Sequence, residues 1–180
     1  IEYSEKVKVG PGMDPSTEMG PLVSREQFER VSGYLRHGRE EGARVLAGGG
    51  RPAHVERGYF VSPTVFADVR PDMRIVREEI FGPVLCAVPF KDPEEVVRHG
   101  NDTEYGLAAA VWTRDVQKAH RLAAILKTGT VWINCYNMFD AAAPFGGYKQ
   151  SGFGREMGKA ALELYTQLKT VWVNLGEHRA

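Results

Sequence analysis

The sequence of 180 residues has little cysteine, no excess of either charge and no long apolar run. Its two cysteines, Cys86 and Cys135, show neither a CxxC pair nor metal-ligand spacing, which argues against a disulfide framework and favours a reducing, cytoplasmic environment. Basic and acidic residues number 23 each, whereas a nucleic-acid binder usually carries a basic excess. No apolar run approaches the roughly 20 residues that a membrane-spanning helix needs. We therefore expect neither a nucleic-acid nor a membrane partner, and no metal site.

What is present is the composition of a globular protein, with 43% hydrophobic and 26% charged residues. A chain of this length is sufficient for a domain with a substantial core. The first residue is Ile1 rather than methionine, and no signal-peptide pattern is found. From this start we expect the chain to be a segment cut from something longer, such as an expressed segment or a proteolytic piece.

Capping residues and apolar periodicity predict alternating strands and helices. Ser24 and Gln27 form a capping-box pattern ahead of a helix that is expected to end near Gly42. Asp92, followed by proline, and Asp115 are expected to cap two further helices. Strands or extended segments are expected at residues 44–47, 58–69, 83–90, 106–113 and 130–134, and the apolar runs at 83–90 and 106–113 indicate strands covered on both faces. The alternation predicts an α/β fold with βαβ units and a parallel sheet.

The pattern changes after Asn134. Residues 135–154 are rich in glycine and aromatic residues and predict a long loop, which either lines a pocket or simply packs down. Gly152, Gly154 and Gly158 have GxGxxxG spacing with no strand ahead of them, so a dinucleotide fingerprint is excluded. A helix is expected at residues 154–165 and a terminal strand at 168–175.

The adjacent carboxylates Glu78 and Glu79 invite the interpretation of a general acid and base. Neighbouring residues of an extended segment point to opposite sides, however, so these two are not expected to share a site. We expect one to pair with Arg74 or Arg77 and the other to face a cavity, where it could accept hydrogen bonds from sugar hydroxyls. On the residues alone, a capping or surface acid stays the alternative.

Four motifs, in this order and spacing, resemble the C-terminal part of the NAD(P)-dependent aldehyde dehydrogenases: EEIFGPVL, NDTEYGLAAAVWTRD, GTVWINCYN and PFGGYKQSGFGREMG. The resemblance extends over roughly residues 10–175. It implies that residues 1–165 are the C-terminal portion of the catalytic domain. Residues 166–180 would then be an oligomerisation strand and tail that join subunits of a homodimer or homotetramer.

The resemblance also implies roles for individual residues. Glu79 would bind the nicotinamide ribose hydroxyls of NAD or NADP, Phe81 would contact the nicotinamide side of the cofactor, and Phe145 would lie near nicotinamide and substrate. The channel for the aldehyde substrate would be lined by Cys135, Asn137 and Phe139.

No catalytic residue is assigned, because the family nucleophile lies in a Gly-Gln-x-Cys context and the general base is a glutamate before a Gly-Gly pair, and neither context occurs here. In the whole enzyme a cysteine thiolate attacks the aldehyde to give a thiohemiacetal, which is oxidised and then hydrolysed to the acid. We therefore expect this chain alone to be inactive.

Two alternatives stay open: a truncated, non-catalytic paralogue that acts as an assembly or regulatory module, and an unrelated α/β domain that binds a small ligand. The substrate stays open as well. Tyr136, Met138 and Phe139 suit an apolar or aromatic aldehyde, but aromatic faces could also bind a cationic one such as betaine aldehyde. The residues here do not decide between NAD and NADP.

Overall fold

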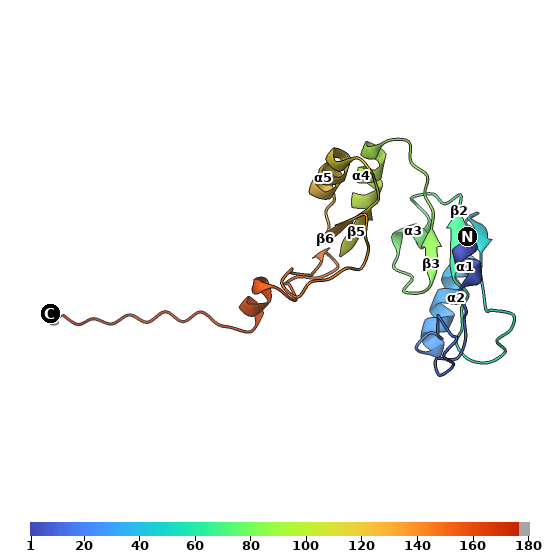
Figure 1. Ribbon diagram of the computed structural model, residues 1–180, viewed down its shortest axis with the longest axis horizontal. Coiled ribbons are helices and arrows are strands. Elements are labelled where there is room, and N and C mark those ends of the chain that lie inside the picture. The colour runs from blue at the N-terminus through green and yellow to red at the C-terminus, as the bar shows by residue number, and fades with distance from the viewer. Residues whose placement is uncertain (177–180) are drawn as a thin grey trace. The chain divides into compact units, whose positions relative to one another are not determined.

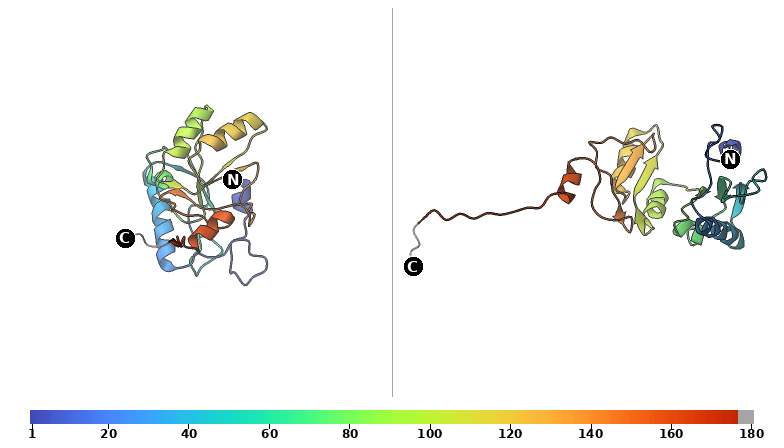
Figure 2. Two further views of the ribbon diagram at one scale, coloured as in Figure 1. Left: turned by 90° about the vertical axis from the view of Figure 1, so that its left-hand side faces the viewer. Right: turned by 90° about the horizontal axis from the view of Figure 1, so that it is seen from below.

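The computed structural model describes residues 1–176 (Figure 1). The chain divides into two compact units, Ile1–Lys91 and Asp92–Ala180, which are described separately below. Both combine helices with short strands (Figure 2), and each contains a parallel strand pair. Within residues 1–176 no helix has the length and apolarity that crossing a membrane requires.

The first unit is a mixed three-stranded sheet accompanied by helices. The short helix α1 (Glu2–Lys6) precedes α2 (Arg25–Glu40), and the sheet has the order β1 (Arg44–Ala47), β2 (Thr64–Ala67) and β3 (Val84–Cys86). β1 is antiparallel to β2, whereas β2 is parallel to β3, and α3 (Arg74–Arg77) lies between these two parallel strands in the sequence.

The core of this unit is made of apolar side chains from α2, the sheet and the α3 region. Val31 and Leu35 on α2 meet Phe66 of β2 and Met73 and Ile75 around α3. All five are at most 4% exposed. Burial on this scale stabilises the unit through the hydrophobic effect and makes it a firm support for the segments that follow α3.

In the second unit, both predicted helix caps are confirmed. The Asp92 side chain accepts from the Glu95 backbone N–H at 2.7 Å, and α4 is Pro93–Asn101. The Asp115 side chain accepts from the Lys118 N–H at 3.0 Å, and α5 is Val116–Ile125.

Two strand pairs complete the second unit. β5 (Ala108–Val111) pairs in parallel with β6 (Thr130–Ile133), and since α5 connects them, the predicted βαβ unit is confirmed here. The sequence did not predict the antiparallel pair of β4 (Tyr105–Gly106) with β7 (Tyr148–Lys149). β7 therefore lies within residues 135–154, which the sequence predicted to be loop throughout.

Three strand and helix predictions need correction. The strand expected at 83–90 is only Val84–Cys86, and neither it nor β5 is fully covered, since Leu85 is 57% exposed and every β5 residue is half-buried. The helix expected at 154–165 is instead a 3₁₀ helix, Lys159–Leu164. Its α-helical start is prevented because Gly154, Met157 and Gly158 have φ values of 80°, 59° and 58°.

The segment expected as a terminal strand, residues 168–175, belongs to no sheet of the described chain, and its large apolar side chains are exposed. Its expected partner strand would come from another subunit. The strand therefore stays a prediction.

Candidate functional site

A hollow of about 380 Å³ in the first unit contains two of the three residues that the sequence singled out for cofactor binding. It is lined by residues from α3, from the turn that follows it and from β3, among them Glu79, Phe81 and Cys86. The turn joins a helix to a parallel strand, so its side chains lie at the edge of the sheet and not within a layer.

Alternating burial sets the direction of the three turn residues. Ile80 is only 7% exposed and packs into the core, while the side chains of Glu79 and Phe81 on either side of it are exposed. Phe81, which is 73% exposed, has a φ of 56°. A bulky residue in this left-handed region is strained and persists only where its surroundings hold it, which is typical of functional sites.

Helix α2 supplies that restraint. The Gln27 side-chain amide donates from Nε2 to the Phe81 carbonyl at 2.7 Å and to the Ile80 carbonyl at 3.4 Å. Arg30 donates from Nη2 to the Glu79 carbonyl at 2.7 Å. Two side chains one helical turn apart thus fix three successive carbonyls.

The sequence analysis missed these two roles. Ser24 does accept from the Gln27 backbone N–H at 3.1 Å, so the N-cap prediction is confirmed. The Gln27 side chain, however, which the capping box would direct back to Ser24, reaches the turn some 50 residues further along the chain. Only the tertiary fold brings the two segments together, and no local sequence pattern predicts this contact.

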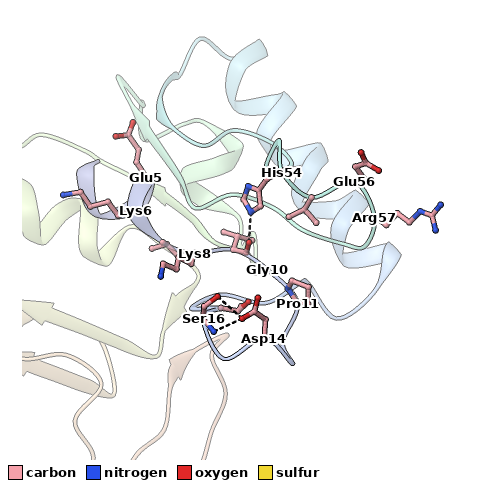
Figure 3. A pocket seen from close by; sticks show the side chains of 14 residues that line it. Glu5, Lys6, Lys8, Gly10, Pro11, Asp14, Ser16, His54, Glu56 and Arg57 are labelled. Atoms are coloured by element: carbon pink, nitrogen blue, oxygen red, sulfur yellow. Dashed lines mark hydrogen bonds between the residues drawn. The ribbon is translucent and has the colours of Figure 1, made fainter.

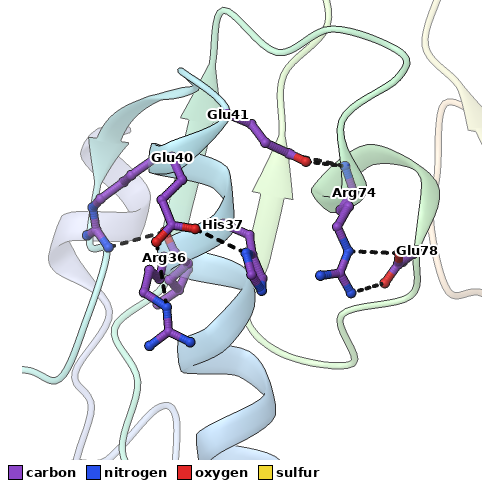
Figure 4. Close-up of polar contacts among 8 residues, drawn as sticks. Arg36, His37, Glu40, Glu41, Arg74 and Glu78 are labelled. Carbon is purple, nitrogen blue, oxygen red and sulfur yellow. Dashed lines mark hydrogen bonds and ion pairs between the residues drawn. The ribbon is translucent and has the colours of Figure 1, made fainter.

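Glu78 is the carboxylate that pairs with a base. It accepts from Arg74 Nε at 2.9 Å and Nη2 at 3.0 Å, and from the Tyr34 hydroxyl at 2.8 Å. Figure 4 shows Arg74 facing Glu78, and Glu41 accepting from the Arg74 backbone N–H. The Arg74 and Tyr34 hydrogen bonds lower the pKa of Glu78 from 4.5 to about 2, so this carboxylate is ionised and engaged.

The Glu79 carboxylate is in a different state. Among residues 1–176 it has no hydrogen-bond or ion-pair partner, and it lies at the wall of the hollow. Both acids line this hollow, so the prediction that only one of them faces a cavity is wrong, whereas the predicted pairing of one acid with Arg74 is confirmed for Glu78. Cys86, in the same wall, donates from Sγ to the Ile75 carbonyl at 3.3 Å, and burial raises the pKa of its thiol.

In the second unit, aromatic rings gather where the chain leaves β6. Phe139 and Phe145 meet edge to face with ring centroids 5.1 Å apart, and Phe139 also meets Trp132 at 5.6 Å. Trp132 contacts Tyr136 at 5.1 Å and donates from Nε1 to the Met138 carbonyl at 2.8 Å. Such pairs are worth about 0.5–1.5 kcal/mol each beyond the area that they bury.

The sequence analysis did not single out Trp132, yet it is the hub of this cluster and only 8% exposed. The sequence placed it only within the strand expected at residues 130–134, and no local pattern indicates that the loop folds against it.

Asparagines direct the start of the same loop. Asn134 and Asn137 have φ values of 53° and 57°, a region that asparagine tolerates better than most residues. The Asn134 amide accepts from the Thr113 N–H at 2.8 Å and donates to the Thr113 carbonyl at 2.9 Å, extending the β5–β6 pairing by one side chain. Asn137 is exposed, and Cys135 is half-buried.

The structure therefore forms two groups from the six residues named in the sequence. Glu79 and Phe81 share one hollow of the first unit. Phe139 and Phe145 are in ring contact in the second unit, and Cys135 and Asn137 belong to the same loop. In the described part of the chain, no cluster of three or more histidine, cysteine or acidic residues could hold a metal ion.

A second hollow of the first unit, about 770 Å³, contains none of these residues (Figure 3). The Asp14 carboxylate there accepts from the Ser16 N–H and hydroxyl, both at 2.8 Å, and His54 Nε2 lies 2.8 Å from the Val9 carbonyl. Glu56 and Arg57 point away from Asp14. Because the polar groups do not converge on one point, this hollow offers no evident chemistry.

Comparison with known proteins identifies relatives along nearly the whole chain. The model of the aldehyde dehydrogenase family matches residues 1–171. The betaine aldehyde dehydrogenase of Brucella anthropi is 50% identical over 179 residues, which are 98% of this chain and 37% of that protein. The mitochondrial aldehyde dehydrogenase of Equus caballus is 54% identical over 167 residues, 93% of this chain and 33% of that protein.

A solved structure agrees with these relatives. The NAD+ complex of an aldehyde dehydrogenase from Bacillus cereus is 57% identical and has a TM-score of 0.93, with 98% of this chain and 35% of that chain covered. The chain thus spans about a third of the length of the curated relatives that it matches.

Proposed function

The chain belongs to the aldehyde dehydrogenase family, and we propose that it supplies the cofactor-ribose contact, part of the substrate channel and a subunit contact of an enzyme that oxidises an aldehyde to a carboxylic acid. Glu79, Phe81 and Phe145 are the proposed cofactor contacts. Cys135, Asn137 and Phe139 are the proposed channel residues.

The observation that carries this proposal is the state of Glu79. An acid that has no partner among residues 1–176 and lies at the wall of a hollow can accept hydrogen bonds from two vicinal hydroxyls through its two oxygens. Phe81, two residues on, offers an exposed aromatic face beside it. A carboxylate and an aromatic face held together fit the ribose and the nicotinamide ring of NAD or NADP, the class of cofactor bound in the Bacillus cereus relative.

When bound, the nicotinamide group accepts the two electrons that the aldehyde loses. The residues of this chain bind and orient. Glu79 fixes the ribose, Phe81 limits the positions open to the ring, and the α2 side chains Gln27 and Arg30 hold the turn that carries both. Holding reactants in one geometry before reaction is the contribution that such contacts make to rate.

The substrate channel is proposed to run along the aromatic cluster of the second unit. Phe139 and Phe145 are in edge-to-face contact, so the proposed channel residue and the proposed cofactor contact of this unit adjoin. An apolar aldehyde would be bound by ring area, and a cationic one by cation–π contact.

The nucleophilic cysteine of the mechanism is proposed to come from residues other than those of this chain. Cys86 is engaged with a carbonyl and has a raised pKa, the opposite of an activated thiolate. We expect the purified 180-residue chain, given an aldehyde and NAD or NADP, to form no reduced cofactor. Formation at a rate near that of a complete family member would refute this part of the proposal.

Glu79→Gln in the full-length enzyme that carries this chain tests the central assignment. The amide keeps the size but accepts fewer hydrogen bonds and carries no charge, so we expect the dissociation constant for the cofactor to rise about tenfold or more and turnover to fall. Glu56→Gln, an exposed acid of the same unit, serves as the matched control and should change neither. Unchanged cofactor affinity and turnover in Glu79→Gln would remove Glu79 from the site.

A second candidate function, an assembly module, is favoured by the exposed side chains of residues 168–175. Val171, Trp172 and Val173 are 72%, 92% and 72% exposed, in a segment rich in β-branched and aromatic residues. We expect this segment to pair with a strand of another subunit in a homodimer or homotetramer. Val171→Pro removes one backbone donor and should weaken the assembly in sedimentation, whereas Lys169→Gln should not. An unchanged oligomeric state in Val171→Pro would exclude pairing through this segment.

A further inference from the structure

We propose that Glu78, held by Arg74 and Tyr34, is a positioning residue that aims the neighbouring Glu79 at the cofactor. This inference rests on the proposed function of Glu79 and extends it to Glu78, whose carboxylate is engaged by Arg74 and Tyr34. Glu78 would then contribute to cofactor binding indirectly, by holding the neighbouring Glu79 in position.

Both ends of Glu78 are held by the same residue. Its backbone N–H donates to the Arg74 carbonyl at 2.9 Å and ends α3, while its carboxylate returns to the Arg74 guanidinium with two hydrogen bonds. A bidentate pair of this kind restricts direction as well as distance. Arg74 is in turn held at its own backbone N–H by Glu41, at 3.1 Å.

Tyr34 connects this anchor to α2. Tyr34 is only 8% exposed, and its hydroxyl donates at 2.8 Å to Glu78 Oε2, the oxygen that also accepts from Arg74 Nη2. The guanidinium groups of Arg30 and Arg74 each lie 5.8 Å from the centre of the Tyr34 ring. Arg30 is also the residue that donates to the Glu79 carbonyl.

The peptide that joins Glu78 to Glu79 is therefore fixed from both sides. Before it, the Glu78 side chain is tied to α3 and α2, and after it the Glu79 carbonyl is tied to Arg30. Ile80 then anchors in the core. With the backbone fixed at these three points, Glu79 retains only its own side-chain torsions, which lowers the entropy lost when it binds a ligand.

The charge of Glu78 suits it to this task. A carboxylate can accept the three hydrogen bonds it receives here without presenting a donor, and Arg74 keeps it ionised across the neutral range. A neutral amide at this position would place one N–H against the donors of Arg74 or Tyr34. The hydrogen bonds that hold the Glu78 side chain would weaken, although the volume of that side chain would stay the same.

A double-mutant cycle in the full-length enzyme tests the proposal. We expect Glu78→Gln to raise the dissociation constant for NAD or NADP, measured by calorimetry, about threefold to tenfold. In a Glu79→Gln background the same change should have no further effect, because the side chain that Glu78 positions no longer makes the contact. Tyr34→Phe removes one hydrogen bond, keeps the ring and should show the same pattern at about twofold to threefold. It also keeps the test decisive if Glu78→Gln does not fold.

A matched control distinguishes the positioning role of Glu78 from an effect on stability alone. Asp68→Asn breaks the Arg44–Asp68 ion pair, which is 2.7 Å long and in the same unit, at a position whose φ of 57° asparagine accepts. It should change the melting temperature without changing cofactor affinity. Equal effects of Glu78→Gln in both backgrounds would overturn the proposal, as would unchanged affinity in Glu78→Gln where Glu79→Gln weakens binding. If Glu79→Gln itself leaves affinity unchanged, the proposed function fails first and this inference with it.

Discussion

The two units of the chain support their site residues in different ways. In the first unit, Glu79 and Phe81 follow a helix whose neighbours form a continuous core, and hydrogen bonds from α2 fix the backbone that carries them. In the second unit, the proposed channel residues lie within residues 135–139, which ring contacts and one hydrogen bond hold around Trp132, whereas further along the same loop the backbones of Phe145 and Glu156 exchange two hydrogen bonds of 2.7 Å. Of the described residues of that unit, only Ala119, Leu122 and Trp132 are buried apolar ones.

This difference separates two kinds of preorganisation. A site whose carbonyls are held by side chains from a packed helix has one geometry, because moving it would break hydrogen bonds and disturb the core together. A loop held by a few aromatic contacts can repack at lower cost. We therefore expect the proposed cofactor contacts Glu79 and Phe81 to be rigid and the proposed channel lining at residues 135–139 to be adaptable.

We expect the largest effect on stability from a substitution in the core of the first unit. Phe66 is 0% exposed, and Phe66→Ala should lower the free energy of unfolding by about 3–5 kcal/mol, from lost burial and the cavity left behind. Urea unfolding followed by circular dichroism measures it. Leu162→Ala, at a residue of the second unit that is 61% exposed, is the control and should stay within about 0.5 kcal/mol. Similar losses in both variants would remove the contrast between the units.

The next prediction addresses the hub of the second unit. Trp132→Phe keeps an aromatic ring but loses the hydrogen bond to the Met138 carbonyl and part of the buried area, so we expect a loss of about 1–2 kcal/mol. Trp112→Phe, at a tryptophan that is 63% exposed, should change stability by less than about 0.5 kcal/mol. Near-ultraviolet circular dichroism should lose more signal in the first variant, because Trp132 contacts both Tyr136 and Phe139, whereas among the rings of residues 1–176 Trp112 meets only that of Tyr136, at 6.5 Å. If both variants behave alike, Trp132 does not organise the loop.

A pair of glycines on α2 sharpens the description of the first core. A Cβ at Gly38 would lie 2.9 Å from the Phe66 ring and 3.0 Å from Ile75, so Gly38→Ala should destabilise the chain by about 1–2 kcal/mol despite better helix propensity. At Gly33 on the same helix nothing lies within 4 Å, and Gly33→Ala should stabilise by about 0.5–1 kcal/mol. Opposite signs in urea unfolding are expected. Stabilisation by both changes would mean that α2 is not packed closely against β2.

Local signals in the sequence predicted much of this architecture. The caps at Ser24, Asp92 and Asp115 and the β5–α5–β6 unit all follow from patterns a few residues long. The sequence offered Arg74 or Arg77 as the partner of one of the two acids, and the structure pairs Arg74 with Glu78, four residues on. These are features that nearest neighbours along the chain determine.

What the sequence could not predict depends on distant partners. Gln27, Arg30 and Tyr34 look like ordinary helix residues until the fold brings the turn at 79–81 against them. The apolar runs at 83–90 and 106–113 suggested strands covered on both faces, but coverage depends on which layers are present, and β3 and β5 are only half-buried. The helix expected at 154–165 failed because three positive φ values interrupt it, and a methionine supplies one of them.

We expect the smallest effect from a change of pH, which tests whether the Arg74–Glu78 ion pair stabilises the first unit. The folded-state pKa of Glu78 is about 2, below its ordinary value of 4.5. Its ionised form therefore stabilises the fold above about pH 4.5, and this contribution is lost as the pH falls from there through about 2. Because the side chain is 43% exposed, solvent screening keeps the contribution small.

Glu78→Gln should consequently reduce the fall in unfolding free energy between pH 5 and pH 3, measured by urea unfolding along a pH series. Arg74→Gln should reduce it in the same way, since the pKa of Glu78 is lowered first by the Arg74 hydrogen bonds. Tyr34→Phe should reduce it less, as the Tyr34 hydrogen bond is the second cause. A pH dependence that is identical in the wild-type chain and in Glu78→Gln would show that the Arg74–Glu78 pair orients the turn without stabilising the unit that carries it.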